Sequence, residues 1–381
     1  MVVAGGGLVG AAIALDLQQR GFDAVLVERG AAPRPFDPGF DDLRVYAVSP
    51  GSMDWLQQLG VWPGIAAQRI SPYSRMQVWS REAGELLVFD AADLHRRQLG
   101  CIVENSLLQS ALWSALDPSR SICGAGISAL EQEDGGIRID LSDGRSLQAS
   151  LLIAADGGDS QLRTMMGIEA ISWSYPQQAI VAHVTTERPH QRCCWQRFLP
   201  TGPLALLPLS DGRCSIVWST TEAERLLALD DDRFMAELAA AIQFRLGAVT
   251  ATTARVSFPL RLSHAGDYVR EGFALAGDSA HTVHPLAGQG VNLGLADGRA
   301  LVATLVRARA AGRRIGSLRT LKAYERARKA DNLEMLAVTD GLYRAFDLEL
   351  PGWARLRDAG MAVVQRLPPL KSLLIRQAAG L

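Results

Sequence analysis

The fold is decided by residues 1–10, MVVAGGGLVG, which place a short apolar strand directly before a turn of glycines. Residues 11–20 continue as an apolar helical stretch, and residues 24–27 form a second apolar strand that ends at Glu28. Strand, glycine turn, helix and strand make a βαβ unit, the nucleotide-binding element of doubly wound α/β folds.

The glycines of this turn follow the pattern GxGxxG at Gly5, Gly7 and Gly10. Gly5 permits the tight turn, Gly7 lets a pyrophosphate approach the backbone, and Gly10 allows close packing of the helix. Glu28 follows eighteen residues after Gly10 and can accept hydrogen bonds from a ribose 2′-hydroxyl. A plain glycine-rich turn is the alternative, but the strand, the helix and the terminal acid together predict a dinucleotide site.

A second motif lies at residues 154–163, AADGGDSQLR, where an apolar strand opens into an Asp-Gly turn at Asp156. Nucleotides bind at such strand ends in α/β sheets, so this turn can direct a carboxylate and backbone amides into the binding crevice. A simple surface turn explains the same pattern when it is taken alone.

The third motif, residues 277–294, GDSAHTVHPLAGQGVNLG, is the most specific in the chain. Asp278 follows the apolar strand at residues 273–276, which suits hydrogen bonding to a polyol such as ribitol. A stiff and then glycine-rich loop leads into a helix N-terminus, whose partial positive charge would stabilise the negative charge of a reduced flavin. The candidate residues of this flavin loop are Pro285, Gly288, Gln289, Gly290, Val291 and Asn292.

Bulk composition excludes several classes of function. Apolar residues make up 48% and charged residues 21% of 381, as in ordinary globular proteins, and a net charge of −1 gives no electrostatic case for nucleic acid. Five cysteines form no CxxC pair, so no metal site is expected and a reducing cytoplasm fits best. No apolar run approaches the ~18 to 20 residues of a transmembrane helix, and the glycine-rich start lacks the basic region of a signal peptide.

With these motifs in place, the sequence resembles the class A flavoprotein monooxygenases, and within them the ubiquinone-biosynthesis ring hydroxylases of the UbiH/UbiF/VisC group. The resemblance covers nearly the whole chain. It includes four further segments, residues 42–49 (DLRVYAVS), 99–105 (LGCIVEN), 202–209 (GPLALLPL) and 324–328 (YERAR).

The resemblance implies FAD as the cofactor. Arg44 would lie near the FAD phosphates and ribityl, Asp278 would hold the ribityl chain, and Asp156 would serve both FAD and the nicotinamide cofactor. Asn105 stands where many class A relatives carry arginine, which leaves its contact to FAD less secure. The cofactor-binding residues that the resemblance assigns are Gly5, Gly7, Gly10, Glu28, Arg29, Arg44, Asn105, Asp156, Asp278, Pro285, Gly288, Gly290, Val291 and Asn292.

The resemblance also implies an architecture, a Rossmann-like FAD-binding domain with an interleaved β-sheet substrate domain and a helical C-terminus, as in p-hydroxybenzoate hydroxylase. The FAD-binding domain is expected at residues 1–71, 98–172 and 265–320, the substrate domain at residues 72–97 and 173–264, and the helical segment at residues 321–381. Within the substrate domain, residues 179–184, 204–209 and 214–219 are expected as short strands.

The implied reaction is hydroxylation of the aromatic ring of a polyprenylated phenol or quinol in ubiquinone biosynthesis. NAD(P)H, a transient electron donor, reduces FAD, O₂ adds at C4a, and the hydroperoxyflavin transfers oxygen to the ring while the protein excludes water. Cytoplasmic localisation with peripheral contact to the inner face of the membrane, and association with other ubiquinone-biosynthesis proteins, are also implied. Three alternatives remain, namely a flavin halogenase, a flavin-dependent prenyl-chain reductase and a non-catalytic prenyl-binding protein; against the halogenase, residues 173–176 (WSYP) do not match WxWxIP.

Other residues admit a functional and a structural interpretation. His281 and His284 flank the flavin loop as proton shuttles or, preferably, as hydrogen-bonded scaffold. Cys193 and Cys194 fit inert core thiols better than a redox pair. Three tryptophans suit an aromatic substrate pocket or the core equally, namely Trp173, Trp195 and Trp218.

The end of the chain combines cations with an apolar stripe, which suits either a helix packed on the core or contact with anionic lipid. The substrate implied by the resemblance favours the lipid contact. The basic residues of this tail are Arg355, Arg357, Arg366, Lys371 and Arg376, and the stripe consists of Leu370, Leu373, Leu374 and Ile375.

Overall fold

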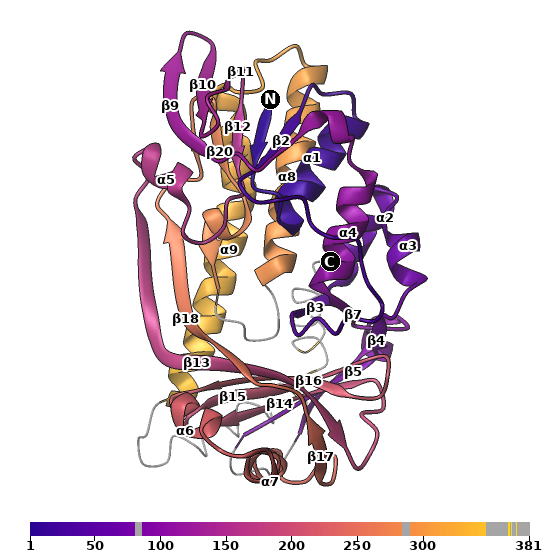
Figure 1. The fold of residues 1–381 in the computed structure, drawn as a ribbon. Helices are drawn as coiled ribbons and strands as arrows, with labels where there is room; N and C mark the ends of the chain where they lie inside the picture. Colours follow the sequence, from indigo (N-terminus) through magenta and orange to yellow (C-terminus); the bar gives the residue numbers. More distant parts are fainter. Residues whose placement is uncertain (81–85, 284–289, 348–364, 366, 368–370, 372–381) are drawn as a thin grey trace.

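The computed structural model describes residues 1–80, 86–283, 290–347, 365, 367 and 371. A nucleotide-binding part at the top of Figure 1 stands on a large sheet at the bottom, and a small sheet lies between them. The candidate residues Pro285, Gly288 and Gln289, like His284, lie outside the described residues.

The nucleotide-binding part is built on a six-stranded sheet in the order β19-β20-β12-β1-β2-β8. Its five strands from β20 to β8 run parallel, and β19 is antiparallel to β20. The strands are β1 (Val2–Ala4), β2 (Val25–Glu28), β8 (Ser121–Cys123), β12 (Leu152–Ala154), β19 (Val269–Arg270) and β20 (Phe273–Leu275).

Helix α1 (Leu8–Gln19) is buried along most of its length because its sequence is apolar on all sides. It packs against α4 (Asn105–Ala115) and α8 (Gly290–Ala310), as well as against β1 and β2. Three shorter helices complete this part, namely α2 (Pro50–Gln58), α3 (Trp62–Ala66) and α5 (Gln161–Met165). A hairpin sheet at its top contains β9 (Ile127–Glu133), β10 (Gly136–Leu141) and β11 (Ser146–Ala149).

The large sheet, here called the substrate sheet, has the order β21-β18-β13-β16-β15-β14-β5-β6, with β17 paired to β13. Its longest strand, β13, spans 17 residues, whereas the sequence predicted a short strand there. The strands are β5 (Arg75–Trp79), β6 (Leu87–Asp90), β13 (Ala170–Thr186), β14 (Cys193–Leu199), β15 (Gly202–Pro208), β16 (Cys214–Thr220), β17 (Val249–Thr252), β18 (Val256–Ala265) and β21 (His281–Thr282).

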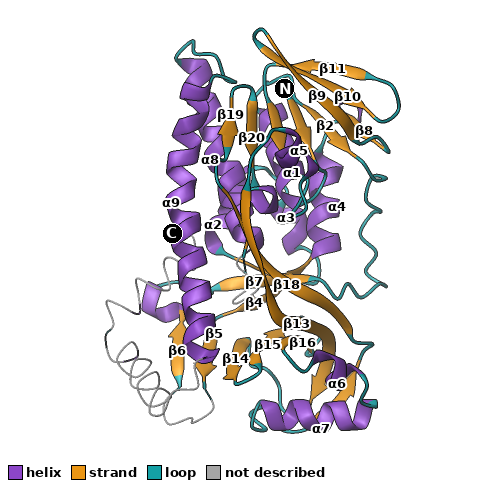
Figure 2. Ribbon diagram, turned by 90° about the vertical axis from the view of Figure 1, so that its left-hand side faces the viewer, coloured by secondary structure: helices purple, strands orange, loops and turns teal. Residues whose placement is uncertain are grey.

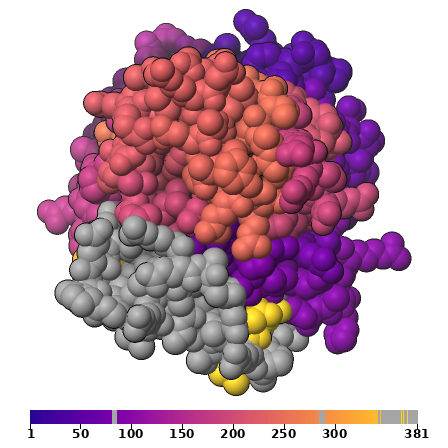
Figure 3. Space-filling view, turned by 90° about the horizontal axis from the view of Figure 1, so that it is seen from below, coloured from indigo at the N-terminus to yellow at the C-terminus, as the bar shows by residue number. Residues whose placement is uncertain are grey.

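The two faces of the substrate sheet have different neighbours because side chains alternate along each strand. On the lower face, Ile216 and Trp218 share a core with residues of α7 (Asp231–Ala241), and α6 (Ala223–Leu227) packs there too. This lower end is formed mainly by the middle part of the chain (Figure 3). On the upper face, Val217 packs against a hydrophobic cluster that includes Leu293 of α8, so this face points toward the nucleotide-binding part.

A small sheet of β3 (Val45–Val48), β7 (Gly100–Glu104) and β4 (Ser71–Tyr73) connects the two parts. Ala47 and Ile102 of this sheet pack on Leu207 of β15, which lies on the upper face of the substrate sheet. The small sheet therefore covers one part of the upper face of the substrate sheet, and α8 covers another part.

Helix α9 (Leu318–Asp347) runs along one side of the molecule and contacts both β19 and β15 (Figure 2). Of the tail, Gln365 accepts a hydrogen bond from the amide of Val88, and Lys371 pairs with Asp93 at 2.7 Å. The other basic and apolar residues that the sequence singled out in the tail lie outside the described residues. Across the described part of the chain, no helix has the length and apolar character to span a bilayer.

Candidate active site

The three sequence motifs meet at one edge of the parallel sheet, because β1, β12 and β20 are neighbours and the motifs follow their carboxyl ends. Gly5 and Gly10 are required because the backbone segments of the motifs approach each other closely here. A Cβ atom on Gly5 would lie 2.2 Å from the carbonyl oxygen of Ala155, and one on Gly10 would lie 1.9 Å from the carbonyl oxygen of Gly5. Gly5 also has a φ of +105°, which favours glycine.

Gly7 differs from these two glycines, because a Cβ there would meet no described atom within 4 Å. It is the N-cap residue of α1, and no side chain caps this helix. The amides at the N-terminus of α1 therefore border open space, as expected where a helix N-terminus receives a pyrophosphate.

Glu28 holds the glycine turn from the neighbouring strand. Its carboxylate accepts hydrogen bonds from the amides of Gly6 at 2.5 Å and Gly30 at 2.7 Å. From the other side, Trp113 Nε1 and Gln109 Nε2 of α4 donate to the carbonyl oxygen of Gly6 at 2.8 and 3.2 Å. The sequence does not predict this contribution of α4, because it depends on contacts between residues more than 100 positions apart.

Asp156 lies against Gly5, but its carboxylate is already engaged. It accepts hydrogen bonds from Ser160 Oγ at 2.6 Å and from the amide of Leu162 at 3.2 Å. The side chain therefore secures the turn that leads into α5, and the backbone of this turn faces the crevice.

Arg44 and Asn105 are adjacent, because the amide of Asn105 donates to the carbonyl oxygen of Arg44 at 2.9 Å. The side chains of Arg44 and Arg29 are exposed, and that of Asn105 is half-buried. Burial raises the pKa of Tyr46, and the nearby charges of Arg44 and Asp278 also act on it. Strand β3 and the third motif therefore face each other.

Asp278 is open to solvent on one side, yet protein surrounds it on the others. This enclosure raises the pKa of its carboxyl, and the charges of His281 and Arg44 oppose the rise. Its carboxylate accepts no hydrogen bond from any residue that the structure describes. It is thus a free acceptor at the site where the sequence predicted a polyol.

Asn292 ties the start of α8 to the small sheet. Its Oδ1 accepts from the amide of Ser49 and from Ser52 Oγ, both at 2.9 Å, and its Nδ2 donates to the carbonyl oxygen of Ala47 at 2.8 Å. Gly290 and Val291 form the first turn of the same helix. Asn292 thereby holds the first turn of α8 against β3, the strand that follows Arg44.

Behind the third motif lies a buried charged network that the sequence did not predict. Asp297 of α8 is fully buried and accepts from His281 Nε2 at 2.5 Å and Arg328 Nε at 2.9 Å. It also accepts from the amide of Gly277 at 3.2 Å and from Asn332 Nδ2 at 3.1 Å. His281 is 1% exposed, which supports its interpretation as scaffold.

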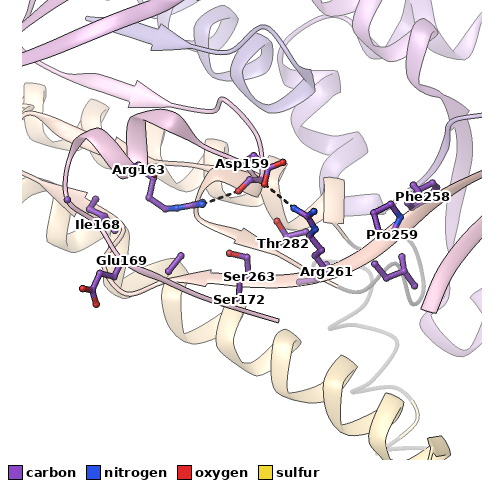
Figure 4. A pocket seen from close by; sticks show the side chains of 16 residues that line it. Asp159, Arg163, Ile168, Glu169, Ser172, Phe258, Pro259, Arg261, Ser263 and Thr282 are labelled. Carbon is purple, nitrogen blue, oxygen red and sulfur yellow. Dashed lines mark hydrogen bonds and ion pairs between the residues drawn. The ribbon is translucent and has the colours of Figure 1, made fainter. Parts of the chain in front are cut away.

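A pocket of about 930 Å³ opens beside the Asp-Gly turn, between this turn and the strands β13 and β18 (Figure 4). Arg261 of β18 pairs there with Asp159 at 3.3 Å, and both side chains are largely exposed. Thr282 and Val283 border the same pocket immediately before the flavin loop. The pocket therefore offers charged and apolar walls next to the cofactor residues.

Two sequence interpretations are settled by burial. Trp195 and Trp218 face the lower side of the substrate sheet, in the core with α7, so they line no pocket toward the cofactor residues; Trp173 is 38% exposed. Burial raises the pKa of Cys193 to about 11 and that of Cys194 well above its ordinary value, which makes both thiols unreactive.

These features fit FAD. The uncapped N-terminus of α1 with open space at Gly7 suits a pyrophosphate, and the carboxylate of Asp278 suits a ribityl chain. Glu28, which ends β2 beside the glycine turn, is an acceptor of the type that a ribose hydroxyl would need. Among the described residues, no group of three or more His, Cys, Asp or Glu side chains could hold a metal ion.

Comparison with known proteins agrees with this chemistry. The family described as FAD binding domain matches residues 1–337. The chain is 40% identical to 3-demethoxyubiquinol 3-hydroxylase of Escherichia coli K12, over all of this chain and 98% of that protein. It is 35% identical to human mitochondrial ubiquinone biosynthesis monooxygenase COQ6, over all of this chain and 92% of that protein.

The fold is shared with p-nitrophenol 4-monooxygenase PnpA of Pseudomonas putida, at a TM-score of 0.78, 18% identity and coverage of 99% of this chain and 97% of that chain. The predicted α/β fold of the p-hydroxybenzoate hydroxylase type is thereby confirmed. The chain belongs to the family of FAD-dependent monooxygenases that includes the ubiquinone-biosynthesis hydroxylases.

Proposed function

We propose that this enzyme hydroxylates the aromatic ring of a polyprenylated phenol or quinol in ubiquinone biosynthesis, with NAD(P)H and O₂ as co-substrates. The observation that carries this proposal is the 40% identity, over the full length, to a hydroxylase named for 3-demethoxyubiquinol. The upper face of the substrate sheet supports it, since apolar residues such as Val181, Leu207 and Val217 suit a ring that bears a prenyl chain.

In this proposal, Gly5, Gly7, Gly10 and Glu28 hold the ADP half of FAD, and Arg29 lies at its edge. Bound FAD would supply the electron transfer from the nicotinamide and the activation of O₂. The other residues proposed to contact FAD are Arg44, Asn105, Asp156, Asp278, Gly290, Val291 and Asn292, together with Pro285, Gly288 and Gln289 of the loop.

The residues of the chain would act by binding and by charge. The N-terminus of α8 would stabilise the negative charge that a reduced flavin carries, because helix N-termini are partially positive. The network around Asp297 would fix the backbone at Gly277 and thereby the neighbouring Asp278. The small sheet and α8 would close the site above the substrate sheet and exclude water.

We infer that the nicotinamide cofactor approaches through the pocket beside the Asp-Gly turn. The exposed Arg261 can exchange its pairing with Asp159 for a phosphate, since an exposed ion pair contributes little stability. Substitution Arg261→Ala is expected to raise the KM for NAD(P)H and to leave FAD content unchanged.

The experiment that tests the function uses a strain that lacks the gene. The strain is expected to accumulate a ubiquinone precursor that lacks one ring hydroxyl, and the wild-type chain restores ubiquinone. Asp278→Ala is expected to give colourless protein that restores nothing, whereas the exposed variant Arg233→Ala restores fully. A strain with unchanged ubiquinone and no precursor would contradict the proposal.

Peripheral contact with the membrane, and association with other ubiquinone-biosynthesis proteins, belong to the same proposal, since a polyprenyl chain resides in the bilayer. Basic residues near anionic lipid each contribute about 1 kcal/mol. Co-sedimentation with anionic liposomes at low and high salt, for the full chain and a chain ending at Leu367, tests the tail. Equal recovery of both forms in the supernatant at low salt would assign the tail to core packing and substrate delivery to a partner.

A further inference from the structure

The upper face of the substrate sheet buries polar side chains that nothing in the described structure satisfies. His183 of β13 is 2% exposed and Ser215 of β16 is 0% exposed. Neither the two ring nitrogens of His183 nor Oγ of Ser215 has a hydrogen-bond partner among the described residues. Burying polar groups in this way costs free energy, so a role in binding or in proton transfer would explain them.

These two residues are direct neighbours, because His183 and Ser215 oppose each other in the antiparallel pair of β13 and β16. Cβ atoms of such a pair are about 5 Å apart. Both side chains share the upper face with Val217, two residues further along β16, since the residues between them face the core with α7. The pair is thus continuous with the face that we assign to the substrate.

Ser215, one member of this pair, lies on the side of the proposed cofactor residues. Val217 packs against a hydrophobic cluster that includes Leu293 of α8. Leu207, which opposes Ser215 on β15, packs against a cluster that includes Ala47 of β3. Ser215 therefore lies between β3, the strand that follows Arg44, and α8, whose first turn contains Gly290, Val291 and Asn292. A phenol bound against this part of the sheet would have its hydroxyl beside Ser215.

His183, the other member of the pair, lies on the side that leads toward solvent. His183 borders a cavity of about 30 Å³, which has room for about one water molecule. Arg213 pairs with Asp41 at 2.9 Å and with Asp211 at 2.6 Å, and these two carboxylates are 44% and 46% exposed. The charged groups that wall the cavity are Asp41, Arg69, Glu104, Asp211 and Arg213.

The protonation state of His183 suits a proton acceptor. Burial, followed by the positive charge of Arg213, lowers the pKa of His183 below its ordinary value of 6.5. The carboxylates of Asp41, Asp211 and Glu104 oppose this shift. The imidazole is therefore neutral at pH 7, with one nitrogen lone pair available.

We propose that Ser215 and His183 form a proton relay from the aromatic hydroxyl of the substrate to the surface, an inference that rests on the proposed function. The substrate O–H bond breaks, its electron pair stays on oxygen, and the proton passes through the Ser215 hydroxyl to His183. From there it moves through a water in the cavity to the carboxylates around Arg213 and to solvent. The ring gains electron density, which favours transfer of an electrophilic oxygen to it.

The first test measures hydroxylation by the holoenzyme as a function of pH. In the wild type, the rate is expected to fall only below pH 6.5, as His183 becomes protonated. In His183→Gln this acid limb is expected to disappear, and the rate at pH 7 to drop by roughly 10²-fold, the usual contribution of a positioned base. The rate of the variant should rise again toward the pKa of a free phenol, about 10.

Ser215→Ala is expected to change the rate in the same direction and keeps the test valid if His183→Gln folds poorly. The matched control is Trp218→Phe, which removes a buried indole N–H that also has no partner among the described residues, but on the lower face of the same strand. This control is expected to keep the wild-type pH profile. An unchanged profile in both His183→Gln and Ser215→Ala would overturn the relay.

The second readout needs no turnover. Anaerobic holoenzyme is titrated with 2-prenylphenol, and the ultraviolet absorption of the phenolate gives the pH at which the bound phenol ionises. Wild type should ionise the phenol at lower pH than His183→Gln, and equal ionisation would overturn the relay. If wild type shows this shift but hydroxylates no polyprenylated phenol, the proposed substrate is wrong and the relay stands.

Discussion

In the nucleotide-binding part, the buried side chains of His281 and Arg328 both donate hydrogen bonds to Asp297, at 2.5 and 2.9 Å. On the upper face of the substrate sheet, His183 and Ser215 are equally buried and have no partner among the described residues. In the first region these buried polar groups are hydrogen-bonded to one another, and they fix the backbone that receives the cofactor. The second region is chemically incomplete, which is the property expected of a surface that receives a polar ring.

The largest effect on folding and on FAD content is expected from a substitution in the glycine turn of the nucleotide-binding part. In Gly10→Val, the new side chain would collide with the carbonyl oxygen of Gly5, since even a Cβ would lie 1.9 Å from it. We expect protein without FAD and with disturbed secondary structure, measured by flavin absorbance and circular dichroism. Gly7→Ala is the control, because open space surrounds it, and should fold. A yellow, folded Gly10→Val protein would contradict the packing described here.

The next effect tests the buried network. Asp297→Ala leaves Arg328 and His281 without their shared carboxylate, and breaking a buried ion pair in this way costs about 3 to 5 kcal/mol. Urea unfolding of the FAD-free protein measures this loss. Glu237→Ala removes an exposed partner of Arg225 and should cost less than about 1 kcal/mol. Equal losses in the two variants would show that the network is no more than a surface feature.

A smaller effect is expected at the end of β2. Glu28→Ala should weaken FAD binding by roughly 1.5 to 3 kcal/mol, or about ten- to a hundredfold, through loss of charged hydrogen bonds to the ribose and to the turn. Quenching of flavin fluorescence gives the Kd, with Glu131→Ala on the distant hairpin as control. Unchanged affinity would remove Glu28 from the cofactor site.

The smallest effect concerns pH. The pKa of Asp278 in the folded, FAD-free protein lies above 3.8, so the folded state binds more protons than the unfolded state between these two pKa values. The free energy of unfolding therefore falls as the pH rises from 3.8 through the pKa of folded Asp278. Asp278→Asn removes this decrease in stability, because its side chain does not ionise. The Tm of FAD-free Asp278→Asn should exceed that of the wild type slightly at pH 7 and not at pH 3, while FAD binds more weakly. A lower Tm at pH 7 would show that the carboxylate stabilises the fold.

The glycine motifs could be predicted from the sequence because each is local. Gly5, Gly10 and Glu28 fall within one βαβ unit. The neighbouring strands β12 and β20 are apolar runs that directly precede the second and third motifs, so the sequence predicts them as well. The network around Asp297 could not be predicted, because Asp297 and Arg328 lie 31 residues apart on different helices and follow no spacing pattern. His183 was missed for the same reason, since its burial and its neighbour Ser215 depend on strand pairing.

One measurement tests the central claim most directly. Purified holoenzyme is given NAD(P)H, ¹⁸O₂ and a polyprenylated phenol that lacks one ring hydroxyl, and the product is analysed by mass spectrometry. We expect a product that carries one ¹⁸O atom on the aromatic ring, formed by the wild type and not by Asp278→Ala. Consumption of NAD(P)H with release of peroxide and no labelled ring, for every phenol and quinol tried, would contradict it.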